Sequence, residues 1–276
     1  MPATTLAQSA VNHPAPPPDL LVVGGVARGG TEMLSALLNS HHQIHLMSRE
    51  LRALRYCNLA TWAHLAAVHQ AFLNPLNRVR DQRFRRQVYR YLWAIMRGHR
   101  LSEQTTLDRI HGALASALAD GSTRYVGDKY PDYAFLYPQY IHRRNTRCIF
   151  IYRDARDVVA SLLARLRRGD WRQRGWARQF DTIPKATEYW LAVMNVLQDL
   201  TRLESNALVI RYEDLVLETQ QTVGTIAGHL EVAAAGFDSG IPTSSSIGRY
   251  RGRLTPDEIQ TVERLAGPMM ATWGYL

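Results

Sequence analysis

A short segment near the amino terminus has the residue types of an anion-binding loop. Residues 25–31, GVARGGT, follow an apolar run and precede apolar residues at helical spacing. Between a buried strand and a helix, such a turn presents backbone N–H groups at the positive end of the helix dipole. Gly29 and Gly30 let the backbone approach an anion closely, while Arg28 adds a fixed positive charge and Thr31 a hydroxyl. The segment therefore predicts a site for a phosphate or phosphosulfate group.

The same segment could also be an ordinary turn between a strand and a helix. The P-loop spacing GxxxxGK[ST] is absent, because no lysine precedes Thr31. The hydroxyl that usually contacts magnesium thus comes without its usual lysine. This argues against a P-loop small-molecule kinase, which remains an alternative that predicts ATP binding and magnesium dependence.

A second phosphate could be bound by Arg153 and Ser161, which lie eight residues apart. Arg153 follows the apolar run 148–152, and open α/β sheets bind ligands at the carboxyl ends of their strands. Ser161 falls on the helix that is expected next. Alternatively, Arg153 pairs with Asp154 or Asp157, and Ser161 is only a small residue packed against the sheet.

Two further segments combine aromatic and charged residues at predicted strand or helix ends. Tyr212 begins the sequence YEDL directly after the apolar run 207–210. Arg249 and Arg251 belong to the segment 248–253, GRYRGR, which precedes the last predicted helix. Both segments could be structural, and the arginines could simply be solvated.

The elements that must position these residues follow from hydropathy patterns. Short apolar runs predict buried strands at 20–24, 148–152 and 207–210, and helical spacing predicts helices at 31–40, 82–96, 158–166, 186–202 and 219–229. Thr255 followed by Pro256 and, three residues after the threonine, Glu258 predicts a capped helix start. Alternating strands and helices predict one α/β domain with a mostly parallel central sheet flanked by helices.

Composition narrows the class of protein further. The 276 residues carry a net charge of +9, which suits a polyanionic partner such as nucleic acid, acidic lipid or a ligand with several phosphates. A non-catalytic, basic polyanion-binding protein is therefore a second alternative. Cys57 and Cys148 have no CxxC spacing, so neither a disulfide framework nor a zinc site is expected, and a cytoplasmic location fits. Residues 1–18 contain PAPPP and predict a disordered lead-in to a domain at 19–276.

The order of these segments resembles that of sulfotransferases that use 3′-phosphoadenosine 5′-phosphosulfate (PAPS). Residues 26–31 are similar to the 5′-phosphosulfate loop of that family, whose usual form is P-[RK]-S-G-T-[TS]. Arg153 with Ser161 resembles its 3′-phosphate element, and Tyr212 lies in a similar YEDL strand end. The resemblance extends from about Leu20 to Tyr275. It implies an α/β fold with a P-loop-like donor loop, PAPS as donor and the bisphosphorylated adenosine (PAP) as product.

The closest resemblance is to the branch that contains protein-tyrosine sulfotransferases and many bacterial sulfotransferases. There a histidine near the end of the first helix precedes a short E-x-R segment, and His41 or His42 and residues 50–52, ELR, stand at similar positions. Residues 128–131, DKYP, resemble that branch's lysine-proline segment.

The loop departs from the family pattern at three positions. Ala27 replaces the usual proline, Gly29 the usual serine, and Glu32 a second threonine or serine. The last two departures remove hydroxyl groups that could donate to the donor's 5′ end. Glu32 also brings a negative charge towards a bound anion.

The resemblance implies a role for each matching residue. The glutamate base of the related branch corresponds to Glu50, although Glu50 could instead pair with a neighbouring arginine, and His45 is another candidate base. Arg28 and Lys129 are expected to stabilise the charge that develops during transfer, without a metal ion. The expected donor contacts come from Arg28, Gly29, Gly30, Thr31, Glu32, Met33, Arg153, Ser161, Tyr212, Arg249 and Arg251.

The acceptor is defined only as a class. Residues 51–120, an expected helical insertion on the acceptor side, and residues 165–185 are rich in arginine and aromatic side chains. They suit a hydroxyl- or phenol-bearing acceptor, possible forms being a peptide tyrosine, a glycan or an acidic natural product. Neither nucleic acid nor a membrane is expected as a partner, and a homodimer is one possible assembly.

Overall fold

A computed structural model describes residues 17–57, 63–68, 82–98, 106–139, 145–169, 175–203 and 206–276. Within these ranges, five parallel strands form one sheet in the order β2-β3-β1-β4-β5. The strands are β1 (Asp19–Gly25), β2 (Ile44–Leu46), β3 (Tyr125–Lys129), β4 (Thr146–Tyr152) and β5 (Ala207–Arg211). Because β1 lies at the centre, the loop that follows it opens at the middle of the sheet's carboxyl edge. Disorder was predicted for residues 1–18, of which residues 1–16 lie outside the described residues.

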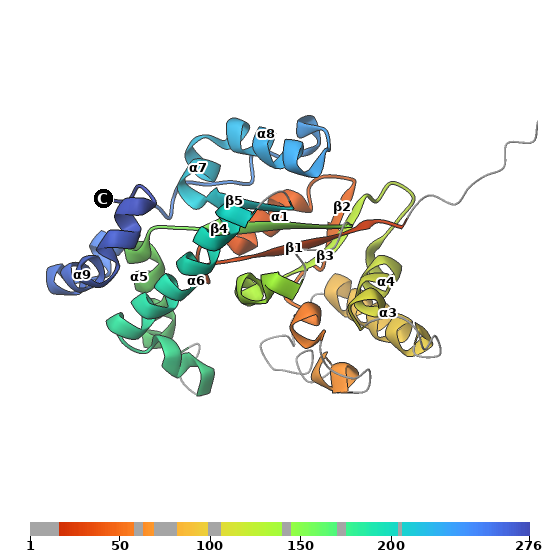
Figure 1. The fold of residues 1–276 in the computed structure, drawn as a ribbon, viewed down its shortest axis with the longest axis horizontal. Coiled ribbons are helices and arrows are strands. Elements are labelled where there is room, and N and C mark those ends of the chain that lie inside the picture. Colours follow the sequence, from red (N-terminus) through yellow and green to blue (C-terminus); the bar gives the residue numbers. More distant parts are fainter. Residues whose placement is uncertain are drawn as a thin grey trace, which may run out of the picture.

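Helices cover both faces of the sheet (Figure 1). On one face lie α1 (Thr31–Leu38), α7 (Tyr212–Leu217) and α8 (Thr219–Leu230), and the core on the other face includes α3 (Gln82–Gly98), α4 (Thr106–Leu118), α5 (Ala155–Arg167), α6 (Ile183–Leu203) and α9 (Pro256–Thr272). Short 3₁₀ helices are η1 (Ala53–Tyr56), η2 (Pro131–Gln139), η3 (Gly175–Phe180), η4 (Ala234–Gly236) and η5 (Arg249–Gly252).

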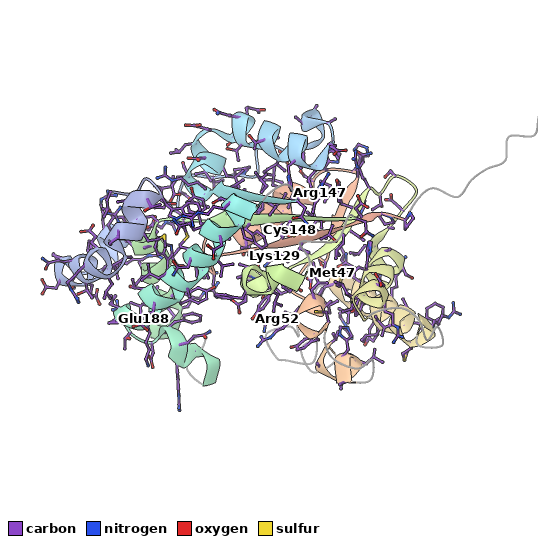
Figure 2. All side chains as sticks on the ribbon, in the orientation of Figure 1. Met47, Arg52, Lys129, Arg147, Cys148 and Glu188 are labelled. Carbon is purple, nitrogen blue, oxygen red and sulfur yellow. The ribbon has the colours of Figure 1, made fainter. Side chains whose placement is uncertain are left out.

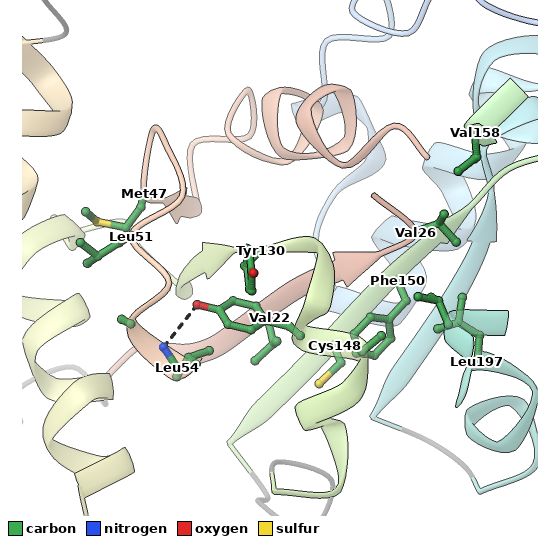
Figure 3. Packing of buried hydrophobic residues seen from close by; sticks show 14 of the residues in the cluster. Val22, Val26, Met47, Leu51, Leu54, Tyr130, Cys148, Phe150, Val158 and Leu197 are labelled. Carbon is green, nitrogen blue, oxygen red and sulfur yellow. Dashed lines mark hydrogen bonds between the residues drawn. The ribbon is translucent and has the colours of Figure 1, made fainter. Parts of the chain in front are cut away.

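Strand β1 is buried on both faces, which explains its unbroken apolar sequence. Leu20 and Val22 belong to the core that includes residues of α5 and α6, whereas Leu21 and Val23 belong to the core that includes residues of α1 and α8. Side chains alternate along a strand, so a strand covered on both faces needs apolar residues at successive positions. Figure 3 shows Val22, Cys148 and Phe150 together in the core that includes residues of α5 and α6.

The structure confirms the predicted fold class and the predicted strands and helices, and it adds strands β2 and β3. β2 has only three residues, and β3 has the sequence YVGDK, in which Asp128 and Lys129 are as buried as the apolar residues. Neither gives an apolar run. Cys57 and Cys148 are both buried free thiols, as expected for Cys148.

The predicted start of the last helix allows a test of how much its cap contributes to the free energy of unfolding. The Thr255 hydroxyl accepts from the Glu258 N–H at 3.2 Å, and the Glu258 carboxylate accepts from the Thr255 N–H at 2.9 Å. We predict that Thr255→Ala lowers the free energy of unfolding by about 1 kcal/mol, measured by denaturant titration. Thr261→Ala, later in the same helix, should change it by less than about half as much. Equal losses would show that the cap contributes nothing specific.

Candidate functional site

The loop between β1 and α1 is a tight turn with unusual backbone angles. The Gly29 N–H donates to the Val26 carbonyl at 2.8 Å, and Arg28, the third residue of this turn, has φ 67°. Ala27 keeps a negative φ, so the angles match a type II turn, whose third position normally holds glycine. The helix then begins after Gly30 at φ 106°, which offers no side-chain cap to the N–H groups of the first turn of α1. The first turn of α1 thus presents N–H groups without a side-chain cap close to Arg28.

A pocket of about 490 Å³ lies against this loop. It brings together seven of the predicted donor-site residues from three parts of the chain, along with three residues that the sequence did not indicate. The predicted residues are Arg28, Gly30, Thr31, Glu32, Met33, Arg153 and Tyr212, and the others are Ile241, Thr243 and Ser246. Arg28 and Arg153 thus line a single pocket.

Arg28 stands in a strongly positive environment. Its Nε donates to the Ser161 hydroxyl at 3.1 Å, which joins the first and second predicted elements. Burial lowers the pKa of Arg28, and the charges of Arg165, Arg153 and Arg168 lower it further, against the opposing effect of Glu32. A guanidinium whose pKa falls in this way sits where positive charge is unfavourable. An anion bound beside Arg28 would relieve that cost.

Arg153 is held in place by several contacts at once. It forms an ion pair with Asp157 at 2.8 Å, donates to the Ser246 carbonyl, and lies over the Tyr212 ring at 4.4 Å. The alternative that Arg153 pairs with Asp157 therefore holds, yet Arg153 still lines the pocket. Pairing fixes the guanidinium without removing it from the site.

Asp157 also anchors the arginine-rich loop. It accepts from the N–H groups of Gly248 at 2.8 Å and Tyr250 at 2.9 Å. Arg249 donates to the Ser245 carbonyl at 2.6 Å, and Arg251 lies over the Tyr250 ring at 4.8 Å. Neither arginine is among the residues that line the pocket, so their predicted contact with the donor remains a prediction.

Tyr212 closes the pocket against the loop. Its hydroxyl donates to the Thr243 carbonyl at 3.2 Å, and a Cβ at Gly30 would lie only 2.5 Å from its ring. Gly30 is therefore needed for close packing as well as for its positive φ.

Lys129 lies at the end of β3, in the middle of the molecule (Figure 2). Its side chain is 2% exposed, and its Nζ is 2.5 Å from Glu32 and 3.0 Å from Glu50. Burial acts to lower the pKa of Lys129, but the two carboxylates outweigh that effect and raise its pKa above the ordinary value. The ammonium group therefore stays protonated, which suits a fixed positive charge.

Glu50 lies between two cations. One carboxylate oxygen accepts from Lys129 at 3.0 Å and the other from Arg52 at 3.3 Å. The expected pairing with an arginine is thus present, together with the contact to Lys129. His45, the other candidate base, instead contacts the His42 carbonyl at 3.0 Å and lies 3.6 Å from Asp120.

Asp128 has a structural role that was not predicted from the sequence. This fully buried carboxylate accepts from the N–H groups of Leu51 at 3.2 Å, Ala53 at 3.0 Å and Lys129 at 2.9 Å, and from the Tyr133 hydroxyl at 2.7 Å. Burial raises the pKa of Asp128 to about 6 against the opposing effect of these hydrogen bonds. Asp128 thereby fixes the segment that carries Glu50 to the end of β3. Its position beside Lys129 in the DKYP segment was the available signal.

No group of three or more histidine, cysteine or acidic side chains within the described ranges is arranged to hold a metal ion. Among the helices of the described residues, none combines the length and the apolar character needed to cross a bilayer.

The comparison with protein families identifies the class of this protein. The model of the "Sulfotransferase family" matches residues 18–235, which include the loop, Lys129, Arg153 and Tyr212. The chain belongs to the sulfotransferase family. This membership confirms the resemblance and the enzyme class that the sequence motifs predicted.

Solved sulfotransferase structures share the fold at low sequence identity. The sulfotransferase domain of the Synechococcus PCC 7002 olefin synthase is 20% identical, with a TM-score of 0.56 over 92% of this chain and 96% of that one. The sulfotransferase domain from the curacin biosynthetic pathway is 19% identical, with a TM-score of 0.58 over 92% and 97%. The mouse sulfotransferase SULT7A1 complexed with PAP is 12% identical, with a TM-score of 0.51 over 92% and 85%. No curated protein matches the chain.

The geometry of the turn changes the meaning of Gly29. A Cβ at this position would lie 2.7 Å from the Val26 carbonyl oxygen, too close for any side chain without backbone movement. We predict that Gly29→Ser, which introduces the usual residue of this loop, lowers the free energy of unfolding by about 1–3 kcal/mol and weakens binding of PAP.

Gly112→Ala provides the control for that substitution, since a Cβ there meets nothing within 4 Å. It should leave stability unchanged or slightly increased. Denaturant titration and a PAP titration measure both effects. Tighter binding of PAP by the serine variant would contradict the steric explanation.

Proposed function

We propose that this protein transfers a sulfonate group from PAPS to the hydroxyl or phenol of an acceptor. The observation that carries the proposal is that Arg28 and Arg153 line one pocket of about 490 Å³. A nucleotide with a phosphate near each end of its ribose fits two cationic positions joined by one cavity. PAP in the similar mouse sulfotransferase supports this choice of donor.

The donor is assigned to the pocket from its two ends. Arg28, Thr31 and the first-turn N–H groups of α1 would hold the 5′-phosphosulfate. Arg153 and Ser161 would hold the 3′-phosphate, and Tyr212 would contact the adenosine end. Arginine is suited to both positions, because its planar donors match phosphate oxygens.

Transfer is an in-line displacement at sulfur. The acceptor oxygen forms a bond to sulfur while the bond between sulfur and the phosphate oxygen of PAP breaks, and the acceptor's proton passes to Glu50. Negative charge grows on the departing phosphate oxygen, where fixed cations stabilise it most. Arg28 and Lys129 would supply this stabilisation. Lys129 is the cation nearer to Glu50, at 3.0 Å.

Glu32 is compatible with this scheme because its carboxylate is directed to Lys129. Glu32 forms an ion pair of 2.5 Å with Lys129, so its negative charge lies beside a cation and not beside the N–H groups of the loop. Glu32 would then share Lys129 with Glu50 at the acceptor side of the pocket.

The proposed acceptor carries a hydroxyl or phenol and bears negative charge. Arg52 lies over the Tyr130 ring at 4.7 Å, and Arg55 donates to the Tyr130 hydroxyl at 3.1 Å. Phe135 is 41% exposed nearby along η2. An acidic peptide tyrosine, an anionic glycan and an acidic natural product are all chemically compatible with these arginine and aromatic side chains. Residues 51–120 remain our proposed acceptor-side insertion, and a cytoplasmic location remains part of the proposal.

A pair of substitutions separates donor binding from transfer. Glu50→Gln should reduce transfer from PAPS by about 10²-fold or more, because it removes the base, while PAP still raises the melting temperature. Arg153→Ala should raise the KM for PAPS roughly 10- to 100-fold and change kcat less. Transfer is measured as PAP release with a phenol, a tyrosine peptide and an alcohol as acceptors. Arg264→Ala, at an exposed position of α9, controls for the loss of a charge.

The same experiment distinguishes the alternative functions. Thermal stabilisation by ATP with magnesium, but not by PAP in EDTA, would favour a kinase and contradict the proposal. Salt-sensitive binding to nucleic acid without any response to PAP would favour a polyanion-binding protein.

A further inference from the structure

The turn that presents Arg28 requires support from outside the loop. Arg28 adopts φ 67°, a left-handed conformation that is unfavourable for a residue with a Cβ. The like charges of Arg165, Arg153 and Arg168 also disfavour its position. Without other contacts, the turn could relax and move the guanidinium away from the pocket.

One contact to the turn comes from helix α6. The Ala27 N–H donates to the Tyr189 hydroxyl at 3.1 Å, across 162 positions of the chain. Ala27 is the second residue of the turn, directly before Arg28. In a type II turn this N–H points outward, so it is free to take a partner from another element.

Tyr189 is itself held in one orientation. Its hydroxyl donates to Asp132 at 3.2 Å, and the other oxygen of Asp132 accepts from the Tyr130 hydroxyl at 2.7 Å. The ring packs edge-on against Phe180, with centroids 4.9 Å apart. Burial raises the pKa of Tyr189 well above its ordinary value, so the hydroxyl keeps the proton that it donates to Asp132. Its lone pairs are then available to Ala27.

The residue at position 27 makes this contact possible, because alanine has an N–H to donate. The usual proline of the resembling loop has no N–H to donate, but it fixes φ near −65° and is favoured at the second position of a type II turn. Alanine has an N–H and more conformational freedom. The hydrogen bond to Tyr189 would restrain the turn through a contact with another helix, whereas proline would restrain it through its own fixed φ.

We propose that Tyr189 is a positioning residue for the donor loop, which holds the turn at Ala27 so that Arg28 faces the phosphosulfate. The inference rests on the proposed function and adds a residue from α6 to the donor site. Because Asp132 and Tyr130 belong to the same network, and Arg55 donates to Tyr130, the loop is also connected to η1, the segment that follows Glu50.

The decisive variant is Tyr189→Phe, which removes the hydroxyl and keeps the ring. The Kd for PAP and the KM for PAPS should rise about three- to tenfold, the usual effect of one hydrogen bond. Adding Ala27→Pro to this variant should restore the Kd to within about twofold of the wild type, since proline restrains the turn without needing a partner. Ala27→Pro alone should raise the Kd, because the proline ring would occupy the place of the N–H that points to the Tyr189 hydroxyl.

A merely structural role for Tyr189 gives a different pattern. Tyr91→Phe is the matched control. Tyr91 lies in α3, and its buried hydroxyl is hydrogen-bonded to His64 at 2.7 Å. It should lower stability and leave the Kd for PAP unchanged. Failure of Ala27→Pro to rescue a folded Tyr189→Phe variant would overturn the proposal.

Amide hydrogen exchange provides a second measurement if the double variant does not fold. Exchange at Ala27 should be at least about tenfold faster in Tyr189→Phe than in the wild type. Unchanged exchange at Ala27 together with unchanged PAP binding would refute the positioning role of Tyr189 but not the proposed function. Absence of PAP binding by the wild-type protein would instead refute the proposed function.

Discussion

The site depends on keeping several like charges close together in a partly buried place. Arg28 lies near Arg153, Arg165 and Arg168, and its pKa is lowered by burial and by these charges. Such an arrangement lowers the stability of the ligand-free protein, and it favours a polyanion for the same reason. Asp157 pairs with Arg153 at 2.8 Å, whereas Arg28 donates to the neutral Ser161 hydroxyl at 3.1 Å.

The other side of the site is organised around Lys129, a protonated side chain that is paired with two carboxylates. Lys129 is buried at the end of β3 and contacts both Glu32 and Glu50. Asp128, the residue before it, ties the Glu50 segment to the same strand end through backbone hydrogen bonds. Sheet geometry therefore fixes Lys129 and Glu50 together. The arginine-rich side around Arg28 and Arg153 suits a donor with two phosphates. The side around Lys129, where cations and carboxylates are paired, suits an acceptor hydroxyl that must lose a proton.

Sequence patterns predicted the parts that rest on local signals. The apolar run of β1, the glycine turn and the capping box of α9 each reflect neighbours in the chain, and all were confirmed. Strand β3 was missed because its buried residues Asp128 and Lys129 are satisfied by partners distant in sequence. Gly29 was interpreted as a lost hydroxyl, whereas the Val26 carbonyl leaves no room for a side chain. The Tyr189 contact joins α6 to the loop and leaves no local pattern.

In the proposed function, one pocket binds two phosphates of the same nucleotide without a metal ion. Isothermal titration calorimetry in EDTA, with PAP, adenosine 5′-phosphate and adenosine 3′-phosphate, tests it directly. If both arginine positions contribute charge-assisted hydrogen bonds, PAP should bind at least about 10- to 100-fold more tightly than either monophosphate. Equal affinity for PAP and one monophosphate, or binding that requires magnesium, would contradict the account.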